Sequence, residues 1–441
     1  MRVLVISGSR ARLPDPVYPL GAAMVGTALR RAGHEVEWFD ALRHDAAADA
    51  LAERLEELRP GAVMLSIRNI DNAAFPGVHR HFEEHLELAR AVGDRGGAPL
   101  VLGGSGFSLM PEAFLAYLDA DFGVVGEGEI AAVELVGELE AGRKPPRLLR
   151  PGRLEPPFLA ADRDLFDAEW YYGRGGAANV QTQRGCRHRC IYCTYPLLEG
   201  HRARRNDPGL VVDEMERIVA GGIRHIFVVD AVLNSPEVHI AEICEEILRR
   251  GLEVSFTGYF APVGELAELP DLLRRAGCGA VELGTDSLSD PVLARMRKGF
   301  TAEQAIDYSR RLRAAGIKQC HNLIFGGPGE SEKTMAESVR RMDQIAPTAL
   351  IATIGLRVYP GTELVRIAGE ADGAGGDPLS LLEPRFYISA DLAGTIVERV
   401  AGWVDERPGW ICPGLGKRYN PRYLERLRRR HKGVLWAMFG D

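Results

Sequence analysis

Short apolar runs alternate with stretches of helical periodicity through the first 140 residues of this 441-residue chain. The apolar runs are RVLVIS (residues 2–7), HEVEWFD (34–40), GAVMLSI (61–67), APLVLGG (98–104) and FGVVGEGE (122–129). Helix-forming segments such as PLGAAMVGTALRRAG and HFEEHLELARAVG lie between them. Strands that alternate with helices over short links predict a parallel, doubly wound sheet. Residues 1–140 are therefore expected to form an α/β domain of the Rossmann or flavodoxin type.

A second and more regular alternation begins at residue 178 with NVQTQRG. Five further strands follow, each after a predicted helix, in HIFVVD, EVSFTGY, AVELGTD, KQCHNLIFGG and ALIATIGLRVY. Six strands with five intervening helices predict a partial (βα)6 TIM barrel over 176–370. The proline- and arginine-rich residues 141–175 read as a wrapping linker, and 371–441 as a small mixed C-terminal extension.

Parallel sheets bind ligands at the carboxyl ends of their strands. In the first domain this rule selects four loops, at residues 7–10, 66–72, 103–108 and 126–129. Ser66, Gly103, Gly104 and Ser105 are small enough there to let a large ligand approach the backbone.

Composition and charge argue against a membrane protein, a secreted protein and a general nucleic-acid-binding protein. The hydrophobic content of 46% is that of a globular domain, and no run is long enough to span a membrane. The amino terminus lacks the apolar stretch of a signal peptide, so a cytoplasmic location is expected. The formal charge of −7 argues against broad nucleic-acid binding. The basic segment RYLERLRRRHKG near the carboxyl end reads as a solvated helix face rather than an RNA site.

Three of the seven cysteines, Cys186, Cys190 and Cys193, lie within eight positions, directly after the first strand of the predicted barrel. A structural zinc site usually takes four ligands, often as two CxxC pairs; no second pair exists here, although His188 lies within the loop. An iron–sulfur cluster also usually takes four thiolates. With only three, one iron would stay open to a substrate or cofactor. The other four cysteines are scattered through apolar segments and read as core residues.

The string CRHRCIYC resembles the CxxxCxΦC motif of radical S-adenosylmethionine (SAM) enzymes. The resemblance implies that the three cysteines bind a [4Fe–4S] cluster, whose fourth iron binds SAM, and that Tyr192 lies near the adenine.

Four later segments resemble that family at the expected strand ends. FVVDAVLN places Asp230 and Asn234 where the SAM amino group is bound, although the Gly-Gly-Glu typical of that position is absent. VELGTDSLSD implies that Glu282, Asp286 and Ser287 face the SAM ribose and carboxylate. LIFGGPGES implies that Gly326 and Gly327 let the backbone approach the adenine, and RVYPGTEL matches the end of the sixth strand.

The first domain resembles the cobalamin-binding domain of one branch of radical SAM enzymes, in YPLG, SIRN, LGGSGF and VVGEGE. The resemblance implies that Ser66, Arg68, Gly103, Gly104, Ser105 and Glu127 line a cobalamin site. The Asp-x-His-x-x-Gly motif that supplies a histidine ligand to cobalt is absent. Arg68 is expected beneath the corrin, where a protonated guanidinium cannot bind cobalt. The alternative is that Arg68 pairs with an acid such as Asp71 or caps a loop.

These resemblances imply an enzyme that methylates an unactivated carbon of a small molecule or natural product through methylcobalamin and a 5′-deoxyadenosyl radical. Tyr259, in TGYF, is the candidate catalytic residue of the substrate site. The implied cofactors are a [4Fe–4S] cluster, SAM and cobalamin, with a flavodoxin or ferredoxin as electron donor. Two alternatives remain open: a radical rearrangement, cyclisation or ring contraction on the same scaffold, and a non-catalytic cobalamin or redox sensor. A methylthiotransferase is disfavoured because residues 1–185 contain no cysteine for a second cluster.

Overall fold

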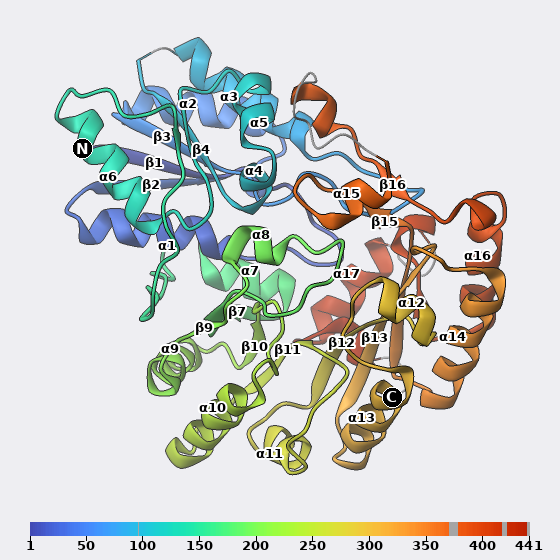
Figure 1. Cartoon of the computed structure of the whole chain (residues 1–441). Helices are drawn as coiled ribbons and strands as arrows, with labels where there is room; N and C mark the ends of the chain where they lie inside the picture. The colour runs from blue at the N-terminus through green and yellow to red at the C-terminus, as the bar shows by residue number, and fades with distance from the viewer. Residues whose placement is uncertain (96, 370–377, 417–420, 439–441) are drawn as a thin grey trace.

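Two α/β units stack in the computed structural model, which describes residues 1–95, 97–369, 378–416 and 421–438 (Figure 1). The expected start of the C-terminal extension, near residue 371, lies outside these residues. Among the described residues, no helix is both long enough and apolar enough to cross a membrane.

The first unit is built on a parallel sheet with the strand order β2-β1-β3-β4-β5-β6. Its strands are β1 (Arg2–Ser7), β2 (Glu35–Asp40), β3 (Ala62–Ser66), β4 (Leu100–Gly103), β5 (Phe122–Val124) and β6 (Leu148–Leu149). The order of the first five strands is that of flavodoxin-like sheets. The predicted fold of this unit is confirmed.

Helices cover both faces of this sheet because each presents one apolar side to it. They are α1 (Leu20–Arg31), α2 (Ala47–Leu58), α3 (Phe82–Arg95), α4 (Ser105–Leu109), α5 (Pro111–Tyr117) and α6 (Glu129–Glu140), with the 3-10 turn η1 (Ala41–Arg43). Leu51, Leu55 and Leu58 of α2 recur at helical spacing and are buried on the face shared with α3 and α5. The helices α1 and α6 pack on the opposite face.

The segment 141–175 is more structured than its composition predicts. It supplies β6, which extends the first sheet, and helix α7 (Ala168–Gly175). Phe166 and Tyr171 are buried in the core of the first unit, and the Tyr171 hydroxyl donates a 2.7 Å hydrogen bond to Asp40. Aromatic residues between the prolines and arginines therefore anchor this segment, which the absence of a regular period did not reveal.

The second unit is a curved parallel sheet with the order β17-β14-β13-β12-β11-β10-β7. Its strands are β7 (Ala178–Val180), β10 (His225–Val228), β11 (Ser255–Phe260), β12 (Ala280–Asp286), β13 (Lys318–Phe325), β14 (Ala349–Ile354) and β17 (Trp410–Ile411). The six predicted barrel strands are present, and β17 from the C-terminal extension adds a seventh. Within the described residues β7 and β17 do not pair, so the barrel stays open as expected.

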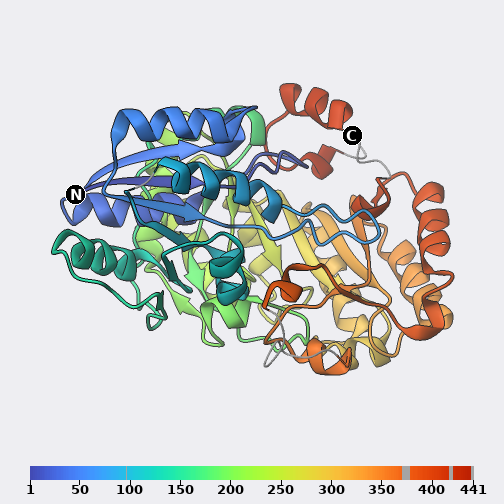
Figure 2. The same cartoon turned by 90° about the horizontal axis from the view of Figure 1, so that it is seen from above.

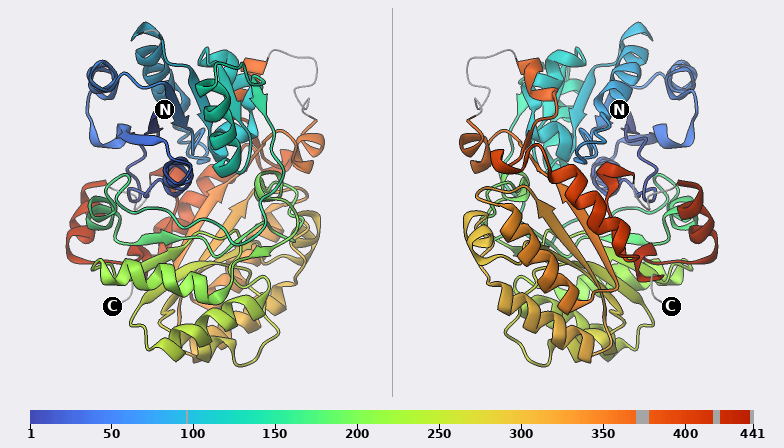
Figure 3. Two further views of the ribbon diagram at one scale, coloured as in Figure 1. Left: turned by 90° about the vertical axis from the view of Figure 1, so that its left-hand side faces the viewer. Right: turned by 90° about the vertical axis from the view of Figure 1, so that its right-hand side faces the viewer.

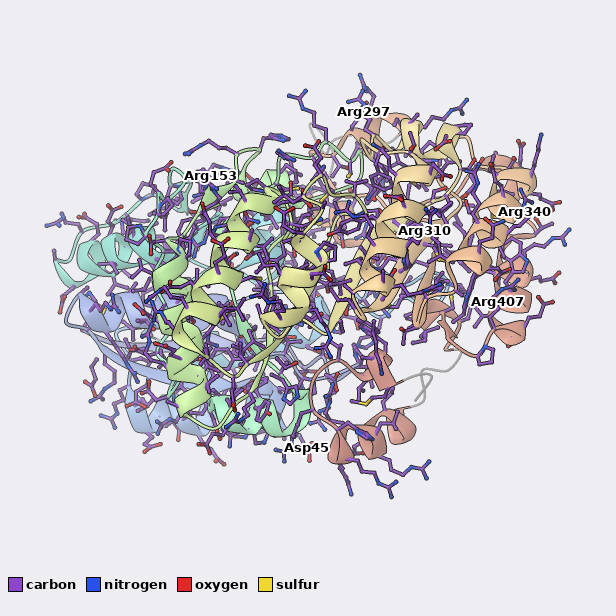
Figure 4. All side chains as sticks on the ribbon, turned by 90° about the horizontal axis from the view of Figure 1, so that it is seen from below. Asp45, Arg153, Arg297, Arg310, Arg340 and Arg407 are labelled. Carbon is purple, nitrogen blue, oxygen red and sulfur yellow. The ribbon has the colours of Figure 1, made fainter. Side chains whose placement is uncertain are left out.

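Helices also pack on the outside of this sheet. They are α9 (Pro208–Ala220), α10 (Glu237–Arg250), α11 (Leu269–Arg275), α12 (Asp290–Arg295), α13 (Ala302–Ala314) and α14 (Glu332–Ile345). Capping boxes begin α13 at Thr301 and α14 at Ser331. The outward faces are charged: Figure 4 shows Arg310 of α13 and Arg340 of α14 projecting from the outer helices.

Shorter elements complete the fold. They are β8 (Gln183–Arg184), α8 (Tyr195–Glu199), β9 (Arg204–Arg205), β15 (Leu356–Arg357), α15 (Glu363–Ile367), η2 (Pro378–Leu382), β16 (Phe386–Tyr387), η3 (Ala390–Leu392), α16 (Ile396–Glu406), η4 (Pro413–Leu415), α17 (Pro421–Arg430) and η5 (Leu435–Met438). Trp436 of η5 is buried against Ala280, Cys320 and Ala349, which lie at the amino ends of β12, β13 and β14. This tryptophan therefore covers the floor of the barrel.

The basic helix α17 is only partly a solvated face. Arg428 is buried in an ion pair with Asp15 of the first unit, whereas Arg429 and Arg430 are exposed. One arginine of the basic segment thus docks the extension instead of facing solvent.

The loop 71–80 forms a tongue that reaches from the first unit across the second (blue in Figure 2). Asp71 and Arg80 pair in an antiparallel bridge at its base. Phe75 forms a bridge with Ile354 at the end of β14, and the Gly77 N–H donates to the Gly414 carbonyl at 2.9 Å. A buried ion pair joins Asp71 to Arg357, with 2.8 Å between Oδ2 and Nε. The tongue therefore links the two units at a point far from residues 141–175.

Candidate active site between the two sheets

The three clustered cysteines lie in the loop between β8 and α8, at the mouth of the barrel. Gly185 adopts a φ of +90°, and a Cβ atom there would lie 2.2 Å from the Arg202 carbonyl oxygen. The Cys186 N–H donates to the Gly200 carbonyl at 3.0 Å, and the Cys193 N–H donates to the Cys190 carbonyl at 3.2 Å. A glycine turn and backbone bonds thus fix this loop before any ligand binds.

The three thiols are free; Cys186 is buried, and Cys190 and Cys193 are half-buried. Burial raises the pKa of each one, that of Cys193 to about 12, while the charge of Lys298 opposes the rise. A cationic metal centre is the partner that would convert such thiols to thiolates. Three thiols are fewer than the four ligands of a closed structural zinc site. The donor set therefore fits a cluster with one open iron better than a structural zinc ion.

Tyr192, Asp286 and Lys298 form a buried polar triad beside the cysteines. Asp286 accepts hydrogen bonds from the Tyr192 hydroxyl and the Lys298 ammonium group, and that ammonium group lies 3.3 Å from the hydroxyl. Burial lowers the pKa of Lys298, but Asp286 and the Cys190 thiol outweigh that effect and raise it. A fixed positive charge therefore lies next to the cysteine loop.

Asp230 and Asn234 lie at the end of β10 with their polar atoms already bonded. Asp230 is fully buried and accepts hydrogen bonds from the Thr182 N–H (2.7 Å), the Thr182 hydroxyl (2.5 Å) and the Gln183 N–H (3.2 Å). Asn234 bonds the backbone of 261–263. In the structure both residues hold loops at the barrel mouth, and a contact with a ligand would replace these bonds.

Glu282 and Ser287 come from opposite ends of the β12 segment, so the structure does not bring them together. Glu282 lies inside the barrel, where burial raises its pKa to about 7 and Trp436 Nε1 donates to it at 2.8 Å. Ser287 lies beyond the strand end and bonds Ser338 of α14 at 3.2 Å. Glu282 is therefore nearer the floor than the mouth of the barrel.

Gly326 and Gly327 form a tight turn after β13. Gly326 has a φ of +96°, and a Cβ atom on Gly327 would lie 2.3 Å from Met296 Cε. Both N–H groups donate to the buried Glu330 carboxylate. Burial raises the pKa of Glu330 to about 7 despite these hydrogen bonds.

The Glu330→Gln variant is expected to be more stable than the wild type at pH 8 but not at pH 5. The folded-state pKa of about 7 lies above the ordinary 4.5, so ionisation of Glu330 destabilises the fold progressively as the pH rises between these values. Glutamine keeps an oxygen for the two N–H donors and removes the charge. The gain at pH 8 is at most about 3 kcal/mol. Melting temperatures of both proteins at the two pH values measure it, and an equal difference at pH 5 and pH 8 would contradict the expectation.

The small residues at the edge of the first sheet bring two strand ends together. Gly104 has a φ of +98°, and a Cβ atom there would lie 2.6 Å from the Ile67 carbonyl oxygen. Ser105 Oγ donates to the Arg68 carbonyl at 3.0 Å, and the Ser66 carbonyl accepts from the Gly8 N–H at 3.2 Å. A Cβ atom on Gly103, at the end of β4, would come no closer than 3.9 Å to another group. The edge carries little side-chain bulk, which fits a large planar cofactor.

Arg68 projects from this edge toward the second unit. Among the described residues no carboxylate pairs with it, because Asp71 binds Arg357 instead. Burial lowers the pKa of Arg68, and the nearby phenols of Tyr171, Tyr259 and Tyr195 act in the opposite direction. The predicted alternative of an Arg68–Asp71 pair is therefore wrong.

Tyr259, on β11, faces the same space. Glu282 and burial raise the pKa of its phenol well above the ordinary value, while the charge of Arg68 lowers it. The residue nevertheless exposes 39% of its surface, and no hydrogen-bond partner for its hydroxyl is found in the described part of the chain. Tyr259 is thus accessible between the two units with its hydroxyl free to bind a ligand.

Glu127 lies in a buried ion-pair network between the units. It pairs with Arg204 of β9 and lies 3.4 Å from Arg184 of β8, which also pairs with Glu129. Both arginines stack over Phe158. The carboxylate of Glu127 is thus used for joining the units, whereas the sequence predicts it to contact a cofactor.

Sequence reasoning missed Lys298 and the partners of Glu127. Lys298 lies in MRKG, where a lysine is usually an exposed turn residue, and only the fold reveals that it is buried. Arg204 is 77 positions from Glu127 along the chain. No local pattern marks either contact.

The chain matches two family models. Residues 7–136 match the B12 binding domain and residues 180–342 match the radical SAM superfamily.

Proteins of known activity resemble most of the chain. A tryptophan 2-C-methyltransferase from Streptomyces laurentii is 26% identical over 82% of this chain and 74% of its own length. A hopanoid C-3 methylase from Methylococcus capsulatus is 26% identical over 78% of this chain and 67% of its own length.

A solved structure is similar over nearly the whole chain. The radical S-adenosylmethionine methyltransferase TsrM from Kitasatospora setae, with tryptophan and a SAM analogue bound, gives a TM-score of 0.88 at 25% identity, covering 99% of this chain and 97% of that one. A second structure of that enzyme, with cobalamin and a [4Fe–4S] cluster bound, gives a TM-score of 0.86 at 26% identity.

Proposed function

Because the chain is a radical SAM protein with a B12-binding domain, we propose that it is a cobalamin-dependent methyltransferase acting on an unactivated carbon of a small molecule. The observation that carries the proposal is that the ligand-binding edge of the first sheet faces the mouth of the barrel in the second unit. Arg68 from the first sheet lies within electrostatic range of Tyr195, two residues beyond Cys193, and of Tyr259 on the barrel. Helix α4, which follows the predicted cobalamin edge, contacts α8, which follows the cysteine loop, and the two units lie one on the other (Figure 3). The named activities of the relatives support the same reaction class.

Three cofactors have residues that fit them. Cys186, Cys190 and Cys193 would hold a [4Fe–4S] cluster, the triad of Tyr192, Asp286 and Lys298 would bind SAM beside it, and the strand edge at Gly103–Ser105 would hold cobalamin. When bound, the cluster and SAM supply a substrate radical and cobalamin supplies the methyl group. The protein's own part is positioning and the exclusion of water.

Tyr259 is the residue that we propose to contact the substrate. Glu282 and burial raise the pKa of its phenol well above the ordinary value, against the charge of Arg68, so the phenol is protonated at neutral pH. A neutral phenol can donate a hydrogen bond to a substrate oxygen or nitrogen. The electrons are proposed to come from a flavodoxin or ferredoxin.

The reaction is tested by anaerobic reconstitution with iron, sulfide, cobalamin and SAM carrying a deuterated methyl group. L-Tryptophan is the first substrate to try, because two of the similar proteins are named for it or bind it. Mass spectrometry should detect a product heavier by one deuterated methyl group, absent when Cys186, Cys190 and Cys193 are replaced. An isomerised or cyclised product without that label would favour rearrangement chemistry. Absence of any SAM turnover across candidate substrates would favour a sensor.

The Arg68→Ala variant is expected to make the bound cobalt harder to reduce, which lowers its reduction potential, while the iron–sulfur cluster stays intact. A charge a few ångströms from the cofactor contributes about 2 to 4 kcal/mol at an effective dielectric constant of 20, and Arg68 has no carboxylate partner among the described residues that would neutralise it. Arg68→Lys, which keeps the charge, is the matched control. Redox titration followed by electron paramagnetic resonance of the cob(II)alamin form measures both the potential and any axial nitrogen. An unchanged potential in Arg68→Ala, or nitrogen splitting from a histidine in the wild type, would contradict this role.

A further inference from the structure

A group of metal-binding side chains lies at the base of the tongue, apart from the cysteines. His79 is on the returning arm of the tongue, His81 follows the tongue directly before α3, and Glu84 is in the first turn of α3. The arm is fixed by backbone bonds: the His81 N–H donates to the Ile70 carbonyl at 2.9 Å, and the Asn72 N–H donates to the His79 carbonyl at 3.1 Å. Asn72 Oδ1 also accepts from the His79 N–H at 3.0 Å. The backbone therefore presents both imidazoles to Glu84 without the help of a ligand.

The three side chains each place a donor atom close to the other two. His79 Nε2 lies 3.7 Å from Glu84 Oε1, and His81 Nδ1 lies 3.9 Å from Glu84 Oε2. One ligand atom from each residue lies within 4.8 Å of the other two. Ligands of one Zn²⁺ ion at bond lengths near 2.1 Å are about 3.4 Å apart. Small side-chain rotations would close the difference, and His79 is exposed and free to make them.

Two of these donor atoms are buried without a hydrogen-bond partner. They are Nδ1 of His81, whose side chain is only 9% exposed, and Oε2 of Glu84. Leaving a buried polar atom unpaired costs about 1 to 3 kcal/mol. A cation between the two atoms would satisfy both at once.

We propose that His79, His81 and Glu84 bind a divalent transition-metal ion that fastens the tongue to helix α3. Two imidazole nitrogens and one carboxylate suit Zn²⁺ or Fe²⁺ rather than Mg²⁺ or Ca²⁺, which prefer oxygen. The ion would stiffen the arm that carries Phe75 and Gly77 to the second unit and would leave coordination positions open to water. The proposal does not depend on the methyltransferase activity, because none of these residues belongs to the site between the sheets.

The test uses the full chain with its cluster reconstituted, so that the three cysteines are occupied. Anaerobic calorimetric titration with Zn²⁺ alone should show one additional equivalent bound by the wild type. His79→Gln, His81→Asn and Glu84→Gln should each weaken that affinity by at least about tenfold. His201→Ala, which removes an exposed histidine elsewhere, is the matched control and should leave binding unchanged. The cluster absorbance, followed in the same samples, reports any displacement of iron.

Thermal melting separates a binding defect from a folding defect. Zn²⁺ should raise the melting temperature of the wild type and of His201→Ala but not of His79→Gln, whose exposed side chain can be changed without disturbing the core. His79→Gln should melt together with the wild type when metal is absent. The proposal is overturned if the wild type binds no Zn²⁺ below about 100 µM, or if binding survives all three substitutions.

Discussion

Replacing Cys186, Cys190 and Cys193 together by alanine is expected to abolish the iron–sulfur chromophore and all SAM-dependent turnover. The three residues are the complete set of thiols at the barrel mouth, since the remaining cysteines are buried in the core. A cluster that loses all its protein ligands has no other residues to hold it. Iron and sulfide analysis after reconstitution, with turnover measured on the same sample, checks the result.

The control for this experiment is Cys244→Ala. Cys244 is fully buried on α10 within the apolar core of the second unit, so its removal should cost only packing energy. It should keep about four irons per chain and its activity. Retention of those irons by the triple variant would refute the assignment of the cluster. Iron that is lost from the triple variant but also lost from Cys244→Ala would point to misfolding instead.

The Glu127→Ala variant is expected to lose about 3 to 5 kcal/mol of stability, because it leaves two buried arginines without a shared carboxylate. Arg184 and Arg204 expose 4% and 2% of their side chains and cannot reach water without opening the contact between the units. We expect the two units to separate at a lower temperature than that at which either sheet unfolds. Thermal denaturation measures the loss, and limited proteolysis locates it.

The matched control is the exposed pair of Glu155 and Arg202, in which the two side chains are 60% and 68% accessible. Glu155→Ala should cost less than about 1 kcal/mol. If the two variants melt at the same temperature, the buried network does not join the units. Glu127→Gln distinguishes charge from shape, since glutamine fills the space but cannot neutralise Arg204.

The fold was predictable because both sheets are parallel and buried on two faces. Strands in such sheets appear in the sequence as continuous apolar runs, as β1 and β3 do. The spacing of the three cysteines is a local property of the sequence, so the cluster site could be predicted from it as well. The partners of Glu127 and Asp286 depend instead on contacts between segments far apart in the chain. Lys298 looks like a surface lysine until α12 brings it against Asp286, and Trp436 reaches Glu282 from 154 positions away.

Glycines and acids in conspicuous motifs were also harder to assign than their motifs suggested. The N–H groups of Gly326 and Gly327 are held by Glu330, and Asp230 is held by Thr182 and Gln183. Sequence identifies such residues as special but does not say whether they serve a ligand or the loop itself. Their expected contacts with SAM stay predictions.

The anchoring of residues 141–175 has a consequence for the order of events during synthesis. The first sheet gains its edge strand β6 at residue 149, and Asp40 finds its hydroxyl partner only when Tyr171 is available. At translation rates of about 5 to 20 residues per second, the 31 residues from 141 to 171 require roughly 2 to 6 s. A nascent chain that has emerged as far as residue 140 therefore carries an incomplete amino-terminal domain for that interval. Chaperones that bind nascent chains would meet it with the edge of β5 still open.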